Sequence, residues 1–98
     1  MSHHEQRGCR GAVVLRGKWP VLVVAVRGAL CAVVPLAAPC LPHHRADVPL
    51  AGCPAVRGHI ARCGAPVLVR AGCLTGIFGT VSAEWLRRVD AALAAEHT

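Results

Sequence analysis

Few residues in this chain have the types and spacing that could carry out chemistry. A serine triad is excluded, because Ser2 lies at the terminus and Ser82 at the start of a predicted helix. His3-His4 and His43-His44 are adjacent pairs, and neighbouring side chains of an extended segment point in opposite directions. Such pairs are typical of solvated loop histidines and are poor joint metal ligands. A cysteine nucleophile activated by a histidine remains an alternative, but nothing in the sequence singles out one Cys–His pair.

The chain contains six Cys. No two of them have the C-x2-C or C-x4-C spacing that lets two thiolates on one turn hold a metal. The segment Leu36–Cys40 faintly resembles a lipoprotein cleavage box, but Pro39 directly before the Cys makes it a poor one. We therefore interpret the cysteines as small apolar core residues of an intracellular protein. They are Cys9, Cys31, Cys40, Cys53, Cys63 and Cys73.

The charge of the chain is strongly positive and unevenly placed. The formal net charge is +6, and residues 81–98 hold two arginines against three acids, so residues 1–80 carry +7 with Glu5 and Asp47 as their acids. Such a body favours a polyanionic partner, because phosphates gain from contacts with Lys and Arg and release counterions. A solvated basic surface without a partner is the alternative, and charge alone does not decide between them.

Residues 19–42 form the most apolar stretch of the chain. A membrane-spanning helix needs about 20 apolar residues, and this stretch reaches that length only by including Arg27, Gly28, Pro35 and Pro39. A charge near the middle of such a helix costs about 2.5–3.5 kcal/mol on insertion scales. Two buried strands separated at Arg27-Gly28 avoid this cost. We therefore favour strands over the alternative of a small membrane-associated peptide.

Short apolar runs bounded by Gly and Pro predict a strand-rich chain. Near the C-terminus, Leu86, Val89 and Leu93 recur at i, i+3 and i+7, which predicts a helix with one apolar stripe. Strands without alternating helices predict a mainly β fold, a small barrel or rolled antiparallel sheet with a C-terminal helix. Irregular structure is expected at residues 52–64 and 72–79. The predicted strands are Ala12–Leu15, Val21–Val26, Leu30–Leu36, Asp47–Leu50 and Val67–Arg70. Pro35 suggests an edge or terminal position in the third of them.

Six segments follow one another in the order of a known pattern of loop, core strands and closing helix. His4–Arg10 is similar to the loop G-x-E-Q-x-G-x-R-P, with apolar Ala12–Leu15 after it. Trp19–Val24 and Val33–Leu36 look like paired core strands, and His43–Leu50 looks like the next loop and strand. Gly79–Leu93 is very like the helix G-T-V-S-x-E-x-L-x-x-V-x-x-A-L. Over about half of its length, the chain thus resembles the MazF/PemK-type toxins of type II toxin–antitoxin systems.

The resemblance implies one SH3-like β-barrel domain over residues 1–98, with an active-site loop at 1–11, barrel strands at 12–70 and a C-terminal helix at 80–96. It implies a cytoplasmic homodimer that cleaves single-stranded RNA without a metal or other cofactor. It also implies that a cognate antitoxin peptide blocks this cleavage. In such cleavage the ribose 2′-OH attacks the adjacent phosphate, and the protein must supply positive charge and proton transfer.

The resemblance also assigns roles to residues. Arg10 matches the family's essential Arg, and a guanidinium offers phosphate oxygens a rigid fork of donors. Glu5 matches the acid of the same loop, which could orient Arg10 or accept a proton. A surface Glu–Arg pair without chemistry is the alternative for these two residues. Contacts to RNA are expected at Arg7, Arg16, Lys18, His43, His44 and Arg45.

Three departures from the family pattern keep a second hypothesis open. The family's Thr after the third strand falls at Ala37, which can neither donate nor accept a hydrogen bond. Gly11 replaces the Pro after the essential Arg, which is expected to loosen the loop. The family's opening strand is missing before His3, so a strand edge is expected to stay unpaired. The chain is therefore either an endoribonuclease or a catalytically inactive relative that binds RNA or an antitoxin.

Overall fold

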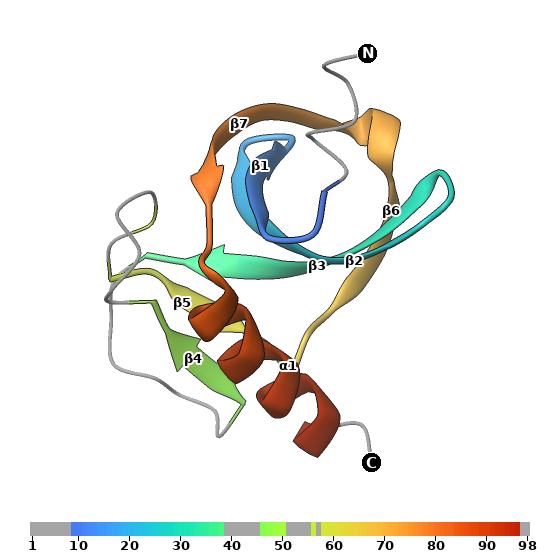
Figure 1. Cartoon of the computed structure of the whole chain (residues 1–98). Helices are drawn as coiled ribbons and strands as arrows, with labels where there is room; N and C mark the ends of the chain where they lie inside the picture. The colour runs from blue at the N-terminus through green and yellow to red at the C-terminus, as the bar shows by residue number, and fades with distance from the viewer. Residues whose placement is uncertain (1–8, 39–45, 51–55, 57, 97–98) are drawn as a thin grey trace.

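The computed structural model of the chain describes residues 9–38, 46–50, 56 and 58–96. This part of the chain forms seven strands and then a helix (Figure 1). In order they are β1 (Ala12–Arg16), β2 (Trp19–Arg27), β3 (Leu30–Ala37), β4 (Asp47–Pro49), β5 (Ile60–Arg62), β6 (Val67–Arg70), β7 (Leu74–Thr80) and α1 (Ala83–Glu96).

The described strands form one antiparallel sheet that rolls back on itself. Their order is β4-β5-β3-β2-β1-β7, and β6 also pairs with β3. A short 3-10 turn, Ala71–Cys73, joins β6 to β7, so one run of chain pairs with β3 at its start and with β1 at its end. Figure 1 shows the resulting roll, with β4, β5 and α1 grouped at one side of it.

Both faces of the central strands are buried, and this explains their unbroken apolar sequences. Alternate residues of β1, β2 and β3 face two different cores. One core also contains helix residues and includes Val13, Leu22, Val24, Val34, Leu36, Leu86 and Val89. The other core includes Ala12, Val14, Val21, Val23, Cys31, Val33, Val69 and Leu74. Residues 21–24 and 31–34 are apolar because the sheet is covered on both sides there. In the described chain no helix has the length and hydropathy to span a membrane.

Helix α1 lies where its sequence pattern predicts. Leu86 and Val89 are buried, and Trp85, Ala92 and Leu93 pack against the same core. Glu84 and Arg88 form the expected i, i+4 ion pair at 3.3 Å. The apolar stripe therefore docks the helix onto the face of the sheet that carries Leu22 and Val34.

The five predicted strands are confirmed, whereas the two stretches predicted to be irregular each contain a strand. β5 has three residues, and β7 is mostly exposed and carries Gly76 and Gly79, so neither has a clear period of two. Backbone pairing with β1 holds β7, and strands therefore continue beyond residue 70. Of the two positions suggested by Pro35, an edge position is wrong, because β3 pairs with β2, β5 and β6. The terminal position is confirmed, since Pro35 lies near the end of β3.

The cysteines divide into two groups. Cys31 and Cys63 are buried, as expected for apolar core residues, and burial raises the pKa of the Cys31 thiol and raises that of Cys63 to about 11. Cys9 and Cys73 are exposed, so the interpretation as core residues is wrong for them. Cys31, Cys63 and Cys73 are free thiols. Cys40 and Cys53 lie outside the described residues.

Candidate functional site

The structure describes three of the eight residues predicted to form the site, and it places them at two locations. Arg10 precedes β1, while Arg16 and Lys18 lie at the turn between β1 and β2. The predicted residues Glu5, Arg7, His43, His44 and Arg45 lie outside the described residues.

Arg10 is held by the fold at three points. Its Nη1 donates to the carbonyl oxygen of Val24 at 2.9 Å and to Oδ1 of Asp90 at 2.9 Å, and its Nη2 donates to Oδ2 of Asp90 at 2.6 Å. The side chains of this ion pair are 43% and 45% exposed. The hydrogen bond to Asp90 raises the pKa of Arg10, so the guanidinium stays charged. An RNA phosphate would have to displace Asp90 or use the remaining N–H groups of Arg10.

Gly11 tightens the segment that it was expected to loosen. It is buried with φ of 91°, a conformation that proline cannot adopt. Its N–H donates to the carbonyl oxygen of Val23 at 2.7 Å, and its own carbonyl oxygen accepts from the N–H of Val81 at 2.8 Å. The expectation of a loosened loop is therefore wrong, and Gly11 is needed here because the backbone has positive φ and uses its N–H.

Position 37, where the family pattern has Thr, lies beside the first residue of β2, whereas Arg10 bonds to a residue near the middle of that strand. Ala37 ends β3 and pairs with Ile60. Val21 pairs with Pro35, and extending this register by two residues sets Trp19 opposite Ala37. Arg10 bonds to Val24, five residues further along β2. The strand register therefore sets Trp19, and not Val24, opposite position 37.

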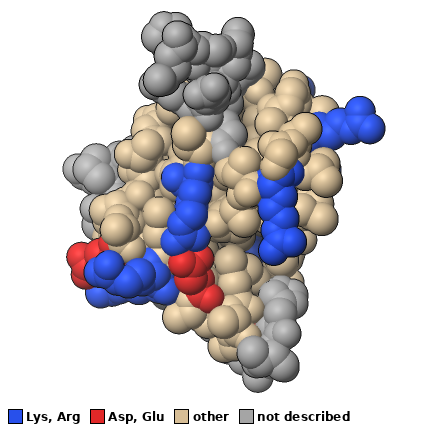
Figure 2. Space-filling view, turned by 45° about the vertical axis from the view of Figure 1, so that its right-hand side comes forward, with Lys and Arg blue, Asp and Glu red and all other residues tan. Residues whose placement is uncertain are grey.

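The turn beside position 37 carries cations that have no acidic partner in the described chain. Arg10, Arg62 and Arg88 are paired with Asp90, Asp47 and Glu84, whereas Arg16 and Lys18 are exposed and unpaired there. Trp19, the first residue of β2 and the neighbour of Lys18, is 73% exposed. Figure 2 shows one face on which the acidic side chains touch basic ones, while other basic side chains stand apart from any acid.

A cleft of about 220 Å³ lies next to this turn. It is lined by Val13, Leu15, Pro20, Val56, His59 and Phe78. Phe78 is 56% exposed, and Nδ1 of His59 is buried without a hydrogen-bond partner. Sequence reasoning missed both residues, because their segments were predicted to be irregular. The available signal was that Phe78 is the single Phe of a chain with few aromatic residues.

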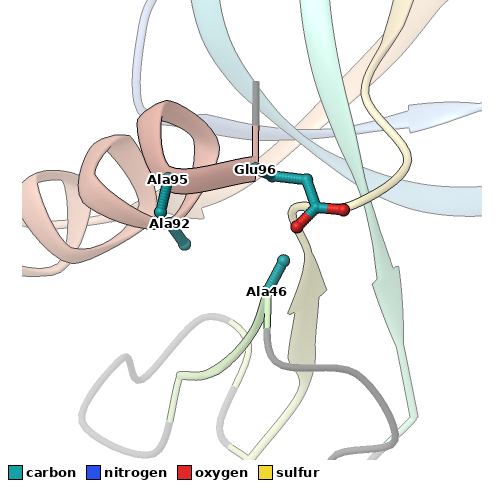
Figure 3. A pocket seen from close by; sticks show the side chains of 4 residues that line it. All are labelled: Ala46, Ala92, Ala95 and Glu96. Atoms are coloured by element: carbon teal, nitrogen blue, oxygen red, sulfur yellow. The ribbon is translucent and has the colours of Figure 1, made fainter. Parts of the chain in front are cut away.

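Two other concave surfaces fit an RNA phosphate less well. The cavity in Figure 3, about 160 Å³, is lined by Ala46, Ala92, Ala95 and the carboxylate-bearing Glu96, so it lacks positive charge. A groove of about 450 Å³ along β2, β3 and β6 is mainly apolar and includes Leu30, Leu68 and Arg27. Within the described ranges, no three His, Cys, Asp or Glu side chains gather as metal ligands.

Comparisons with known proteins give a likeness in fold. No family model matches the sequence, and no curated protein matches it either. An endoribonuclease solved with its cognate antitoxin from a mycobacterial species matches with a TM-score of 0.77 and 18% identity, over 90% of this chain and 92% of that chain. A second mycobacterial endoribonuclease matches with a TM-score of 0.75 and 16% identity, over 92% of this chain and 91% of that chain. The Mycobacterium tuberculosis toxin MazF-mt6 matches with a TM-score of 0.73 and 14% identity, over 90% of this chain and 96% of that chain.

These matches also bear on the strand that the sequence suggested was missing. Each toxin is covered over more than nine tenths of its own length. Within the described sheet, β1 has β2 on one side and β7 on the other. The loss of an opening strand is therefore not supported. The rolled antiparallel sheet with its closing helix α1 is the fold of the MazF endoribonuclease toxins.

Proposed function

We propose that the chain is a MazF-like endoribonuclease that cleaves single-stranded RNA without a metal. The likeness to solved endoribonuclease toxins over about nine tenths of both chains supports this proposal. The net charge of +6 suits a polyanionic substrate. Exposed cations and exposed aromatic side chains on neighbouring elements are a combination that single-stranded nucleic acid favours.

The proposed reaction is an internal transfer at phosphorus. The ribose 2′-OH loses its proton and attacks the adjacent phosphorus, and the bond to the 5′-oxygen breaks. The 5′-oxygen leaves with a proton, which gives a 2′,3′-cyclic phosphate and a free 5′-OH. A positive charge at the phosphate oxygens stabilises the pentavalent transition state, because negative charge accumulates there.

Two cations are candidates for this role. The sequence pattern assigns it to Arg10, with Glu5 of the same loop as the orienting or proton-accepting group. The register of β2 and β3 favours Lys18, because its turn lies beside position 37 while Arg10 is occupied by Asp90. We propose Lys18 as the phosphate-facing cation and Arg16 as an RNA contact. Arg7, His43, His44 and Arg45 remain proposed RNA contacts in the adjoining segments.

The second candidate function is that of an inactive relative that binds RNA or an antitoxin. Ala37 favours it, because a methyl group cannot take over the hydrogen bonds of the family's Thr. Such a relative would have the same fold and the same basic turn but would not cleave RNA. It predicts salt-sensitive RNA binding without any cleaved product.

The proposed partners include an antitoxin peptide and a second copy of the chain, in the cytoplasm. One matched endoribonuclease was solved with its cognate antitoxin. The mainly apolar groove along β2, β3 and β6, where Leu68 is 69% exposed and Leu30 44% exposed, supports a homodimer. Sedimentation of the wild type and of Leu68→Glu tests this assembly, which Leu68→Glu is expected to weaken.

An RNA digestion in the presence of a chelator tests the proposed function. Purified chain is incubated with a mixed-sequence, single-stranded RNA in excess EDTA, and the ends of the products are identified by mass spectrometry. We expect fragments that end in a 2′,3′-cyclic phosphate. Bound but intact RNA would favour the inactive relative instead, and neither binding nor cleavage would contradict both functions.

A further inference from the structure

The cleft beside the β1–β2 turn has the size of one aromatic ring. A cavity of about 150 Å³ already holds benzene, and this cleft measures about 220 Å³. Five of its six lining side chains are apolar, and His59 supplies the polar group. Ligand sites commonly combine an apolar lining with one or two placed polar groups that fix orientation. The cleft is thus large enough for an aromatic heterocycle.

Phe78 gives the cleft an aromatic surface. Its side chain is 56% exposed, although it is the chain's single Phe. The ring lies close to Gly76, where a Cβ would stand 3.5 Å from ring atom Cε2. An exposed ring on a strand is a platform on which a nucleic-acid base can stack.

His59 offers one hydrogen-bond donor at this place. Its Nδ1 is buried and has no partner. The neutral tautomer with its proton on Nε2 avoids a buried, unpaired N–H at Nδ1. Nε2–H is then the group left to donate to a ligand. A carbonyl oxygen on the edge of a bound ring would satisfy it.

Positive charge borders the cleft on the side of the turn. Leu15 and Pro20 line the cleft, and Arg16 and Lys18 lie between them in the sequence. Both cations are exposed and without an acidic partner in the described chain. A ring bound in the cleft therefore has cations next to it, where a sugar-phosphate backbone would run.

We propose that this cleft binds one uracil base of single-stranded RNA, with the ring against Phe78 and a carbonyl oxygen accepting from Nε2 of His59. The inference rests on the proposed RNA-directed function and names the chemical group that the chain would select. Uracil carries a carbonyl oxygen at C4, on the edge that faces outward from the sugar, whereas cytosine and adenine carry an amino group at the corresponding position. Uracil-rich RNA is therefore bound more tightly than adenine-rich RNA.

Binding of non-cleavable RNA tests the inference separately from catalysis. Fluorescence anisotropy is measured with 2′-O-methyl octamers of uridine and of adenosine, because a blocked 2′-OH cannot attack. The wild type is expected to bind the uridine octamer several-fold more tightly. Phe78→Leu is expected to weaken that binding about tenfold, in line with the loss of one base stack. His59→Leu is expected to abolish the preference for uridine.

Ile77→Leu is the matched control, since Ile77 is 41% exposed on the same strand but does not line the cleft. Its binding should equal that of the wild type. Thermal melting by circular dichroism shows whether each variant is folded. The unaltered chain provides a second readout, because the ¹⁵N resonance of His59 Nε2 should shift when the uridine octamer is added.

The outcomes separate this inference from the proposed function. Equal binding of both octamers by the wild type, or a His59 resonance that does not move, would overturn the base site even if RNA is cleaved. A uridine preference that depends on His59 and Phe78, in a chain that cleaves no RNA, would support the base site and contradict the nuclease.

Discussion

The carboxylate of Asp90 accepts two hydrogen bonds from the terminal nitrogens of Arg10, and this ion pair joins the segment before β1 to helix α1. A third hydrogen bond, from Arg10 to the carbonyl oxygen of Val24, adds β2 to the same junction. Arg10 therefore ties three elements together near the middle of β2, five residues along the strand from Trp19. A structural role accounts for its contacts without any substrate.

The Arg10–Asp90 pair is expected to contribute to stability and not to cleavage. Arg10→Ala should lower the free energy of unfolding by about 0.5–1 kcal/mol, since partly exposed ion pairs seldom contribute more. Urea unfolding of Arg10→Ala, Asp90→Ala and the double variant measures the coupling between the two residues. If the two single effects simply add, the pair does not stabilise the fold.

Gly11→Ala is expected to destabilise the chain by about 1–3 kcal/mol, because a side chain is strained at positive φ. A Cβ there would also stand 3.1 Å from Cδ1 of Leu86 and 3.3 Å from the carbonyl oxygen of Val81. Gly72→Ala is the matched control, since a Cβ at Gly72 meets nothing within 4 Å. Equal melting temperatures for the two variants would contradict this view of Gly11.

Cys63 predicts a loss of stability in alkaline solution. Burial, and then the charges of Asp47 and Asp90, raise its pKa from 9.0 to about 11. Between these values the unfolded chain releases the thiol proton while the folded chain keeps it, so stability falls as pH rises from 9 to 11. Denaturation at several pH values should show the difference between the wild type and Cys63→Ala shrinking over this range. A constant difference would contradict the shifted pKa.

Ala37→Thr tests whether position 37 belongs to the site. A hydroxyl there could donate to or accept from a substrate, which alanine cannot do. We expect faster RNA cleavage than in the wild type. Ala38→Thr is the control, because it adds the same hydroxyl to the neighbouring exposed residue. Equal effects of the two changes would argue against the register that sets position 37 beside Trp19.

Features that depend on local pattern could be predicted from the sequence. The stripe of Leu86, Val89 and Leu93 identifies α1, and the apolar runs identify β1, β2 and β3. β7 could not be found in this way, because it has little buried surface and is held by backbone pairing with β1. Its sequence therefore lacks the alternation of apolar and polar residues by which a strand is predicted.

The arrangement of the site depended on long-range register, which the sequence does not contain. The sequence predicts Lys18 as an RNA contact, but nothing local shows that its turn lies beside Ala37. Asp90 follows the helix pattern as an ordinary exposed acid, so its pairing with Arg10 could not be anticipated. His59 and Phe78 come together in space only after the sheet has rolled.

The most direct test of the account compares RNA cleavage by Lys18→Ala and by Arg10→Ala, in a chelator, at equal concentrations of folded protein. Arg87→Ala, which removes the same charge from an exposed position on α1, is the control for net charge. We expect Lys18→Ala to lose cleavage, and Arg10→Ala and Arg87→Ala to retain it. Cleavage that survives in Lys18→Ala and disappears in Arg10→Ala would contradict the account and return the catalytic role to Arg10.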